Sequence, residues 1–173
     1  MNKAGNNTLV DLKDFLDYLL AEGRIAQADH DSAMLGRRSA EDRNKHVLHY
    51  LADLELNDAK VAGKKLDIES LTMALSKQSG QDYYRIDPLK IDAAQVTQVM
   101  SYAFTQRHHI LAVEVSPVEV TITSAEPYMT SWESDLEHVL QKKIKSVISH
   151  QVKIKRLTPE LYSLSSSISG ATE

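Results

Sequence analysis

The stretch from residue 110 to residue 123 reads ILAVEVSPVEVTIT, and it decides the fold of the second half of the chain. Apolar and polar residues alternate on both sides of Ser116-Pro117, which is typical of two strands that each turn one face toward a core. Because the connection between the two runs is so short, we expect them to pair as an antiparallel hairpin.

The patterns on both sides of this hairpin complete a β-α-β-β-α-β order. Before it, residues 83–86 read as a short strand that Asp87-Pro88 ends, and Asp92 is placed to cap a long helix. After it, a helix with Trp132 on its apolar face precedes a strand over residues 145–149. This order is the split-βαβ pattern, so we expect a small, mostly antiparallel sheet with helices on one face.

Residues 1–80 show only helical patterns, so the sequence predicts the α+β class, with a helical amino-terminal region before an α+β module over residues 81–164. The first helix is expected over residues 8–21, capped by Thr8 and ended by Gly23. Five leucines recur along it at helical spacing: Leu9, Leu12, Leu16, Leu19 and Leu20.

Further helices are expected over residues 25–35, from Ser39 through Leu54, and from Asp67 to Gly80. A last helical stretch, interrupted at Thr158-Pro159, ends the module. Small polar residues then fill positions 165–173, and we interpret them as a linker.

Composition narrows the classes of function. Apolar residues make up 42% and charged residues 25% of the 173 residues, as in ordinary globular proteins. The net charge of -4 argues against a general nucleic-acid binder, and the absence of cysteine excludes disulfides and thiolate metal sites. The chain lacks the apolar run of a secretory signal and any run long enough to span a membrane, so we expect a cytoplasmic location.

The sequence contains no motif of a self-contained active site. The fragment nearest to a P-loop, Gly63-Lys64-Lys65, lacks the first glycine and the hydroxyl that would hold magnesium. His46 and His49 are spaced to reach one ion from a helix, but no further ligand completes a site. We therefore expect no catalytic residue, no metal and no cofactor in this chain.

Three segments together resemble the amino-terminal domain of type II secretion and type IV pilus assembly ATPases: Tyr84–Asp92, Arg107–Val113 and Val120–Pro127. In that family a strand leads to a helix, then to a strand of pattern R-H-x-I-L-x-V, then to a strand that ends A-x-x-P. The resemblance covers residues 47–168, and residues 162–170 resemble the exit toward the ATPase core.

The resemblance implies a non-catalytic docking and regulatory domain. Its implied partners are the ATPase core of the same polypeptide and an inner-membrane assembly protein that holds the domain at the membrane periphery. It implies neither nucleic-acid binding nor membrane insertion, and it assigns ATP hydrolysis and a hexamer only to the full-length protein.

Some members of the family bind cyclic di-GMP through the pattern R-L-G-x-x-L-x-x-x-G, followed by L-x-x-x-L-x-x-Q. Aligned on Gly23, this chain has Asp14 at the arginine position and Leu16 at the first glycine. His30 and Met34 stand at the two later leucines, and Arg37 replaces the glutamine. Arg37 and Arg38 remain as candidate ligand-binding cations, and a cyclic di-GMP-sensing domain is the alternative function.

The first helix also offers candidates for partner docking. Val10 and Phe15 lie off the leucine face, so they must be buried either in a partner or against the other helices, and both alternatives stay open. In the first case Lys13, Asp14 and Asp17 would form a polar rim around the contact.

Overall fold

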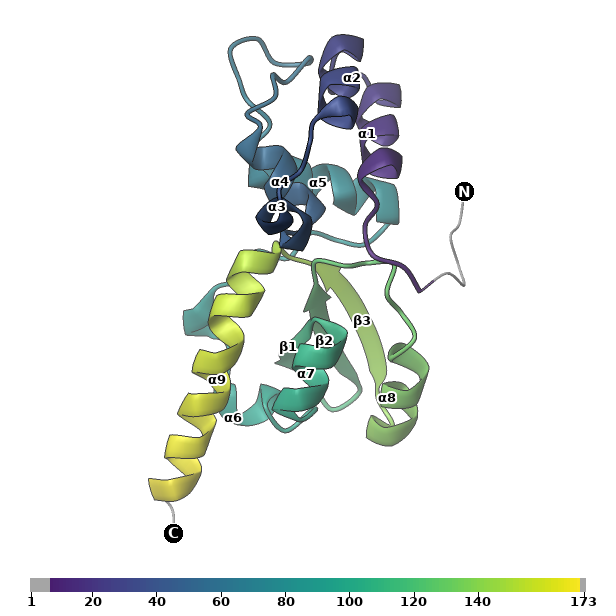
Figure 1. Ribbon diagram of the computed structural model, residues 1–173. Helices are drawn as coiled ribbons and strands as arrows, with labels where there is room; N and C mark the ends of the chain where they lie inside the picture. Colours follow the sequence, from purple (N-terminus) through teal and green to yellow (C-terminus); the bar gives the residue numbers. More distant parts are fainter. Residues whose placement is uncertain (1–6, 172–173) are drawn as a thin grey trace. The chain divides into compact units, whose positions relative to one another are not determined.

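The computed structural model describes residues 7–171, with side chains described through residue 167 (Figure 1). The chain divides into two compact units. The helical unit comprises Thr8–Gly80, and the sheet unit runs from Gln81 onward and includes Asn7. The predicted α+β class, with helices first and a sheet module afterwards, is confirmed.

The helical unit contains five helices among its residues: α1 (Leu12–Ala21), α2 (Gln27–Leu35), α3 (Ala40–Asn44), α4 (Val47–Asp53) and α5 (Ile68–Ser79). Helix α5 has both ends as predicted. The Asp67 carboxylate accepts the Ser70 N–H at 2.8 Å, and Gly80 adopts a left-handed conformation with φ 75° that ends the helix.

Two details of this unit correct the prediction. Asp11, not Thr8, caps α1, because its extended backbone lets the carboxylate accept the Asp14 N–H at 3.0 Å. The helix expected after Ser39 breaks into α3 and α4, since Lys45 and His46 have extended backbones and the His46 ring caps α4 through the Leu48 N–H at 3.1 Å.

The sheet unit follows with short helical and extended elements: η1 (Pro88–Lys90), α6 (Ala93–Val96), α7 (Tyr102–His108), β1 (Ile110–Val115), β2 (Glu119–Ser124), α8 (Glu133–Leu140), β3 (Lys143–Ile148) and α9 (Gln151–Ala171). The strands lie in the order β1-β2-β3. The predicted hairpin is confirmed, because β1 and β2 pair antiparallel from Ile110 opposite Ser124 to Val115 opposite Val120.

The sheet is mixed rather than mostly antiparallel. Strand β3 pairs with β2 in parallel, from Glu119 opposite Lys143 to Ser124 opposite Ile148. The segment with α8 is long enough to carry the chain back to the start of the sheet, which a parallel pairing requires.

The strand expected over residues 83–86 is reduced to a single parallel bridge between Tyr83 and Ile148. The helix expected after Asp92 is split, because the Ser101 hydroxyl accepts the Phe104 N–H at 3.1 Å and starts α7 anew. A proline ends the first of these elements and a side-chain cap ends the second, although the apolar pattern continues beyond each point.

Helix α9 runs through Pro159 without interruption, contrary to the predicted break. Thr158 bonds its hydroxyl to the Ile154 carbonyl at 2.7 Å, and Pro159 lies exposed on the helix surface. Residues 165–171, interpreted as linker, continue this helix, and Ser165 accepts a 2.8 Å hydrogen bond from Thr97.

The core of the sheet unit contains the residues expected there. Val113, Ile122, Trp132 and Leu136 are all buried in one cluster, and Phe104 packs against it partly buried. Helices α6, α7 and α9 contact β1, whereas α8 contacts β3.

Candidate functional site

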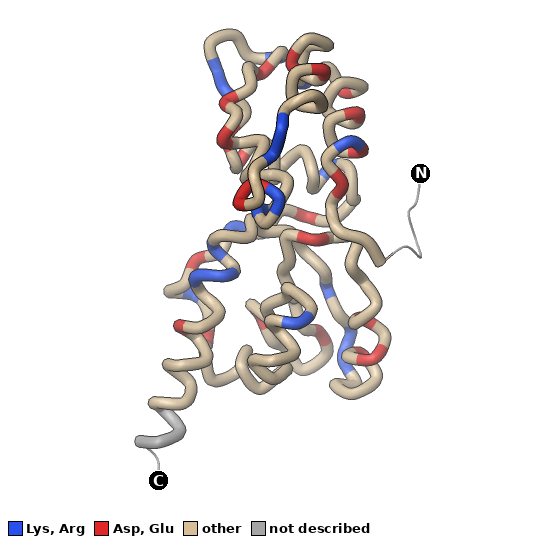
Figure 2. The backbone as a smooth tube through the Cα atoms, in the orientation of Figure 1, with Lys and Arg blue, Asp and Glu red and all other residues tan. Residues whose placement is uncertain are grey.

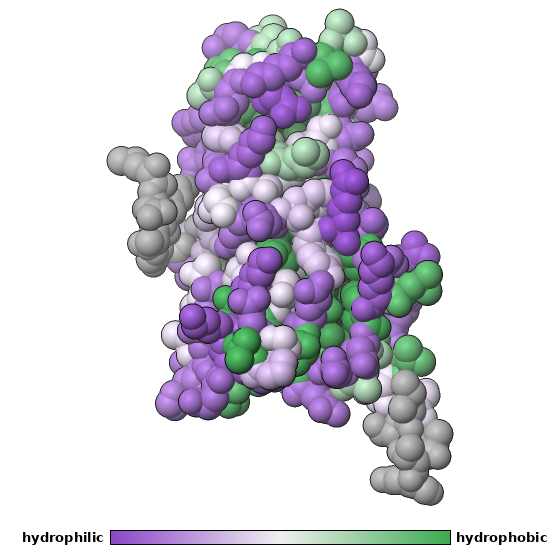
Figure 3. Space-filling model, turned by 180° about the vertical axis from the view of Figure 1, so that it is seen from behind, coloured by the Kyte–Doolittle hydropathy of each residue, from purple (hydrophilic) through white to green (hydrophobic). Residues whose placement is uncertain are grey.

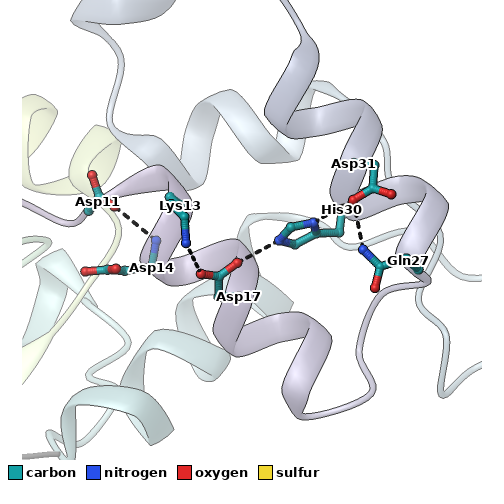
Figure 4. Close-up of polar contacts among 7 residues, drawn as sticks. All are labelled: Asp11, Lys13, Asp14, Asp17, Gln27, His30 and Asp31. Atoms are coloured by element: carbon teal, nitrogen blue, oxygen red, sulfur yellow. Dashed lines mark hydrogen bonds and ion pairs between the residues drawn. The ribbon is translucent and has the colours of Figure 1, made fainter.

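Helices α1 and α2 are joined by polar contacts centred on Asp17 and His30 (Figure 4). Asp17 Oδ1 lies 2.8 Å from His30 Nε2, and Asp17 Oδ2 accepts a 2.7 Å hydrogen bond from Lys13 Nζ. Asp31 Oδ1 lies 3.2 Å from His30 Nδ1 and accepts a 2.8 Å hydrogen bond from Gln27 Nε2. His30 therefore bridges a carboxylate of α1 and a carboxylate of α2.

This arrangement favours the protonated form of His30, since only the imidazolium donates from both ring nitrogens. The hydrogen bonds to Asp17 and then Asp31 raise the pKa of His30 above its usual value. The hydrogen bonds from Lys13 and then His30 lower the pKa of Asp17, and those from His30 and then Gln27 lower the pKa of Asp31. The hydrogen bonds of His30 to Asp17 and Asp31 thus join the two helices, and they strengthen when the imidazole is protonated.

Val10 and Phe15 are not surface residues, which corrects their assignment as docking candidates. They are 5% and 0% exposed, and the Phe15 ring stacks on Tyr18 with centroids 6.4 Å apart. Helix α1 contacts both α2 and α5, so it buries side chains beyond its leucine stripe. The alternative that both residues pack inside the domain is therefore the correct one.

The polar residues expected as a rim do lie at the surface. Lys13, Asp14 and the partly exposed Asp17 are on α1, but Lys13 and Asp17 are already engaged with each other and with His30. Their role as a rim stays a prediction.

Arg37 and Arg38 follow α2. Arg37 is exposed, whereas the Arg38 guanidinium lies 5.6 Å from the centre of the Tyr50 ring. Of the positions aligned with the cyclic di-GMP pattern, Leu16 is fully buried and Asp14 is exposed. A ligand with two phosphates on α1 would meet carboxylates there, which disfavours its binding.

A partly buried ion pair fixes the loop of residues 57–65 to the turn after α1. Arg24 Nη2 lies 3.2 Å from Asp58 Oδ2, with side chains 19% and 6% exposed. The Lys60 N–H also bonds to Asp58 Oδ1 at 2.9 Å, and Ala59 N–H to the Arg24 carbonyl at 2.9 Å. Burial acts to raise the pKa of Asp58, but the hydrogen bonds from Lys60 and Arg24 lower it overall.

The histidine pair considered for metal binding does not form a site. His46 is buried with its Nδ1 engaged in capping α4, so this nitrogen is not available to an ion shared with His49. Among residues 7–171, no three histidine or acidic side chains are grouped in a way that could hold a metal ion. Within the same range, no helix is long and apolar enough to cross a membrane.

Sequence reasoning missed a cavity of about 350 Å³ between α7 and α9, which we call the α7–α9 groove. Its walls include Tyr102, Gln106, Ile110, Ile154 and Lys155. These residues come from α7, β1 and α9, which lie far apart in the sequence, and only the fold brings them together.

The family model of the MshEN domain matches residues 79–168 of the chain. Among curated proteins, the type IV pilus assembly ATPase TfpB of Acinetobacter baylyi (strain ATCC 33305 / BD413 / ADP1) is 35% identical over 160 residues. That alignment covers 92% of this chain, and the chain spans 27% of the length of TfpB.

Two solved structures share the fold. One, described as MshE with cdg, has a TM-score of 0.52 at 15% identity, covering 86% of this chain and 98% of that chain. The other, the N-terminal domain of XpsE, has a TM-score of 0.50 at 14% identity, covering 88% and 96%. At these identities the likeness concerns the fold alone.

Proposed function

Because the chain belongs to the MshEN domain family, we propose that it is a non-catalytic docking and regulatory domain that links a type II secretion or type IV pilus assembly ATPase to the inner-membrane platform. The resemblance to the amino-terminal domains of these ATPases is confirmed by the family match and by the similarity to TfpB. The observation that carries the proposal is the family match over the whole sheet core.

The chemistry of the chain supports a role without catalysis. The sequence has no P-loop, and the most polar cluster, around His30, is made of side chains that already satisfy one another. In the proposed role the domain lies on the cytoplasmic side, at the membrane periphery, and is joined to the ATPase core of the same polypeptide. ATP hydrolysis and the hexamer belong to the full-length protein.

Calorimetric titration of the intact chain with the cytoplasmic domain of the inner-membrane assembly protein tests this function. We expect saturable binding with a defined stoichiometry. An absence of heat and of co-elution in size-exclusion chromatography, with both proteins folded, would refute the docking role.

A second candidate is a cyclic di-GMP-sensing domain of the same kind of ATPase. The similar fold of the structure described as MshE with cdg favours it. Asp14 and the buried Leu16 at the aligned positions oppose it, so we expect no heat on titration with cyclic di-GMP. Saturable binding that Arg37→Ala and Arg38→Ala together abolish would make this the better function.

A further inference from the structure

We propose that the α7–α9 groove is a docking site for an acidic amphipathic helix of a protein partner, an inference that rests on the docking function above. Helices α7 and α9 contact each other and β1, and Figure 1 shows them side by side on the β1 side of the sheet. The groove between them is open to a partner segment. All the residues that line it belong to the sheet unit.

The lining of the groove suits apolar side chains. Ile110, Ala125 and Ile154 contribute apolar walls, while Gln106 and Lys155 lie exposed at its margin. The volume of about 350 Å³ lies near the lower end of the roughly 300–1,000 Å³ typical of ligand sites. It is therefore of a size for a few side chains of a helix laid along it.

One wall is held in place before any partner arrives. The Tyr102 hydroxyl accepts a 2.8 Å hydrogen bond from Gln106, and its ring lies 5.3 Å from the ring of Tyr162. Tyr162 is anchored in turn, because its hydroxyl bonds to the Met100 carbonyl at 2.7 Å and lies 3.1 Å from Thr105 Oγ1. A preformed wall lowers the entropy lost on binding.

Charge indicates the chemistry of the occupant. Lys155 lies exposed at the margin of the groove and forms no ion pair within the described part of the chain. Its neighbours Lys153 and Arg156 are exposed as well but line a different cavity. Figure 2 shows that basic residues gather on the first half of α9.

No carboxylate lines the groove, and Glu160, the one acidic residue on α9 through residue 167, lies beside Arg156 at a different cavity. An unpaired lysine at the margin of an apolar groove that no carboxylate lines complements a helix with apolar residues on one face and acidic residues at its edge.

The shape of the surface favours a protein over a lipid bilayer. Lipid binding needs apolar side chains that protrude together, whereas the groove is concave. The exposed large apolar residues of the sheet unit are spread over several segments, with Tyr102 on α7, Val152 and Leu164 on α9, and Leu89, Val118 and Val139 elsewhere. On the face shown in Figure 3, apolar side chains are interspersed with hydrophilic ones.

The test uses the intact chain and the cytoplasmic domain of the inner-membrane assembly protein, with affinity measured by calorimetry. Lys155→Glu reverses the charge at the groove, and Gln106→Trp fills it from an exposed position. Lys143→Glu is the matched control, because Lys143 is an exposed lysine on β3 that does not line the groove. Circular dichroism confirms that each variant is folded.

We expect Lys155→Glu and Gln106→Trp each to weaken binding by about tenfold or more and Lys143→Glu to leave it unchanged. Raising NaCl from about 50 to about 300 mM should weaken the wild type more than Lys155→Glu, since it screens the added pairs.

Three results overturn the proposal. Wild-type affinity in both groove variants would place docking elsewhere while leaving the proposed function intact. No binding by the wild type would refute the proposed function, and with it the groove as its site. Binding to vesicles with about 30% phosphatidylglycerol that Lys155→Glu abolishes, with unchanged affinity for the protein, would make lipid the occupant.

Discussion

Trp132→Ala is expected to destabilise the sheet unit by about 4 kcal/mol. Trp132 is 4% exposed in the core cluster, and its indole N–H donates to the Met129 carbonyl at 2.8 Å. A buried tryptophan removes about 200 Å² from water, which at about 25 cal/mol/Å² gives an upper bound near 5 kcal/mol. Measured Trp→Ala substitutions in cores cost about 3–5 kcal/mol, which includes the cavity left behind.

Urea unfolding followed by far-UV circular dichroism measures this loss. Fluorescence is unsuitable because Trp132 is the only tryptophan and the variant removes the signal. Trp132→Phe is the matched control: it keeps much of the ring, loses the hydrogen bond and should cost only about 1–2 kcal/mol. A change below about 1 kcal/mol for Trp132→Ala would mean that the residue is not buried, and the core described above would be wrong.

Three further predictions follow from the described contacts. The stability of the helical unit should fall as the pH rises above about 6.5, the usual pKa of histidine. The hydrogen bonds to Asp17 and Asp31 raise the pKa of His30 in the folded state, so their stabilising contribution is complete below the unfolded-state pKa and is lost as the pH passes the folded-state pKa. Urea midpoints of the wild type and of His30→Asn, measured against pH, check this, and equal slopes for the two would contradict it. Asp58→Ala should lower the free energy of unfolding by about 3 kcal/mol in thermal unfolding, since it leaves Arg24 without its buried partner. The control is Asp53→Ala, which removes the exposed carboxylate of the Lys45–Asp53 pair and should leave the melting temperature nearly unchanged. The isolated chain should neither bind nor hydrolyse ATP, because its sequence offers no cradle for triphosphate and magnesium; turnover that a substitution within the chain abolishes would refute this.

Elements whose ends are marked by side chains could be predicted from the sequence. Helix α5 begins after the Asp67 cap and ends at the left-handed Gly80, and the β1–β2 hairpin follows from alternation around Ser116-Pro117. Where an apolar period continues across a local cap, as at Ser101, periodicity alone predicts one helix where there are two. Pro159 predicted a break where there is none, because contacts of α9 with the core maintain the helix across it.

The candidate site could be predicted less well, since it depends on which helices meet. The sequence showed that Val10 and Phe15 lie off the leucine face, but only the fold decides that they are buried. The α7–α9 groove joins residues such as Gln106 and Lys155, which have no spacing that a local pattern could detect.

Because α9 is unbroken, it fixes both the direction and the distance over which the chain extends beyond the sheet core. Leu161 is the last buried apolar residue described on this helix, and the helix continues to Ala171. Ten residues of helix advance about 15 Å along one axis, and a flexible linker of equal length has a similar root-mean-square span of about 16–19 Å but no preferred orientation. Helix α9 is anchored in the sheet core, so it turns when that core turns. Rotation of the core therefore displaces the far end of α9, whereas a flexible coil of the same length would absorb the rotation.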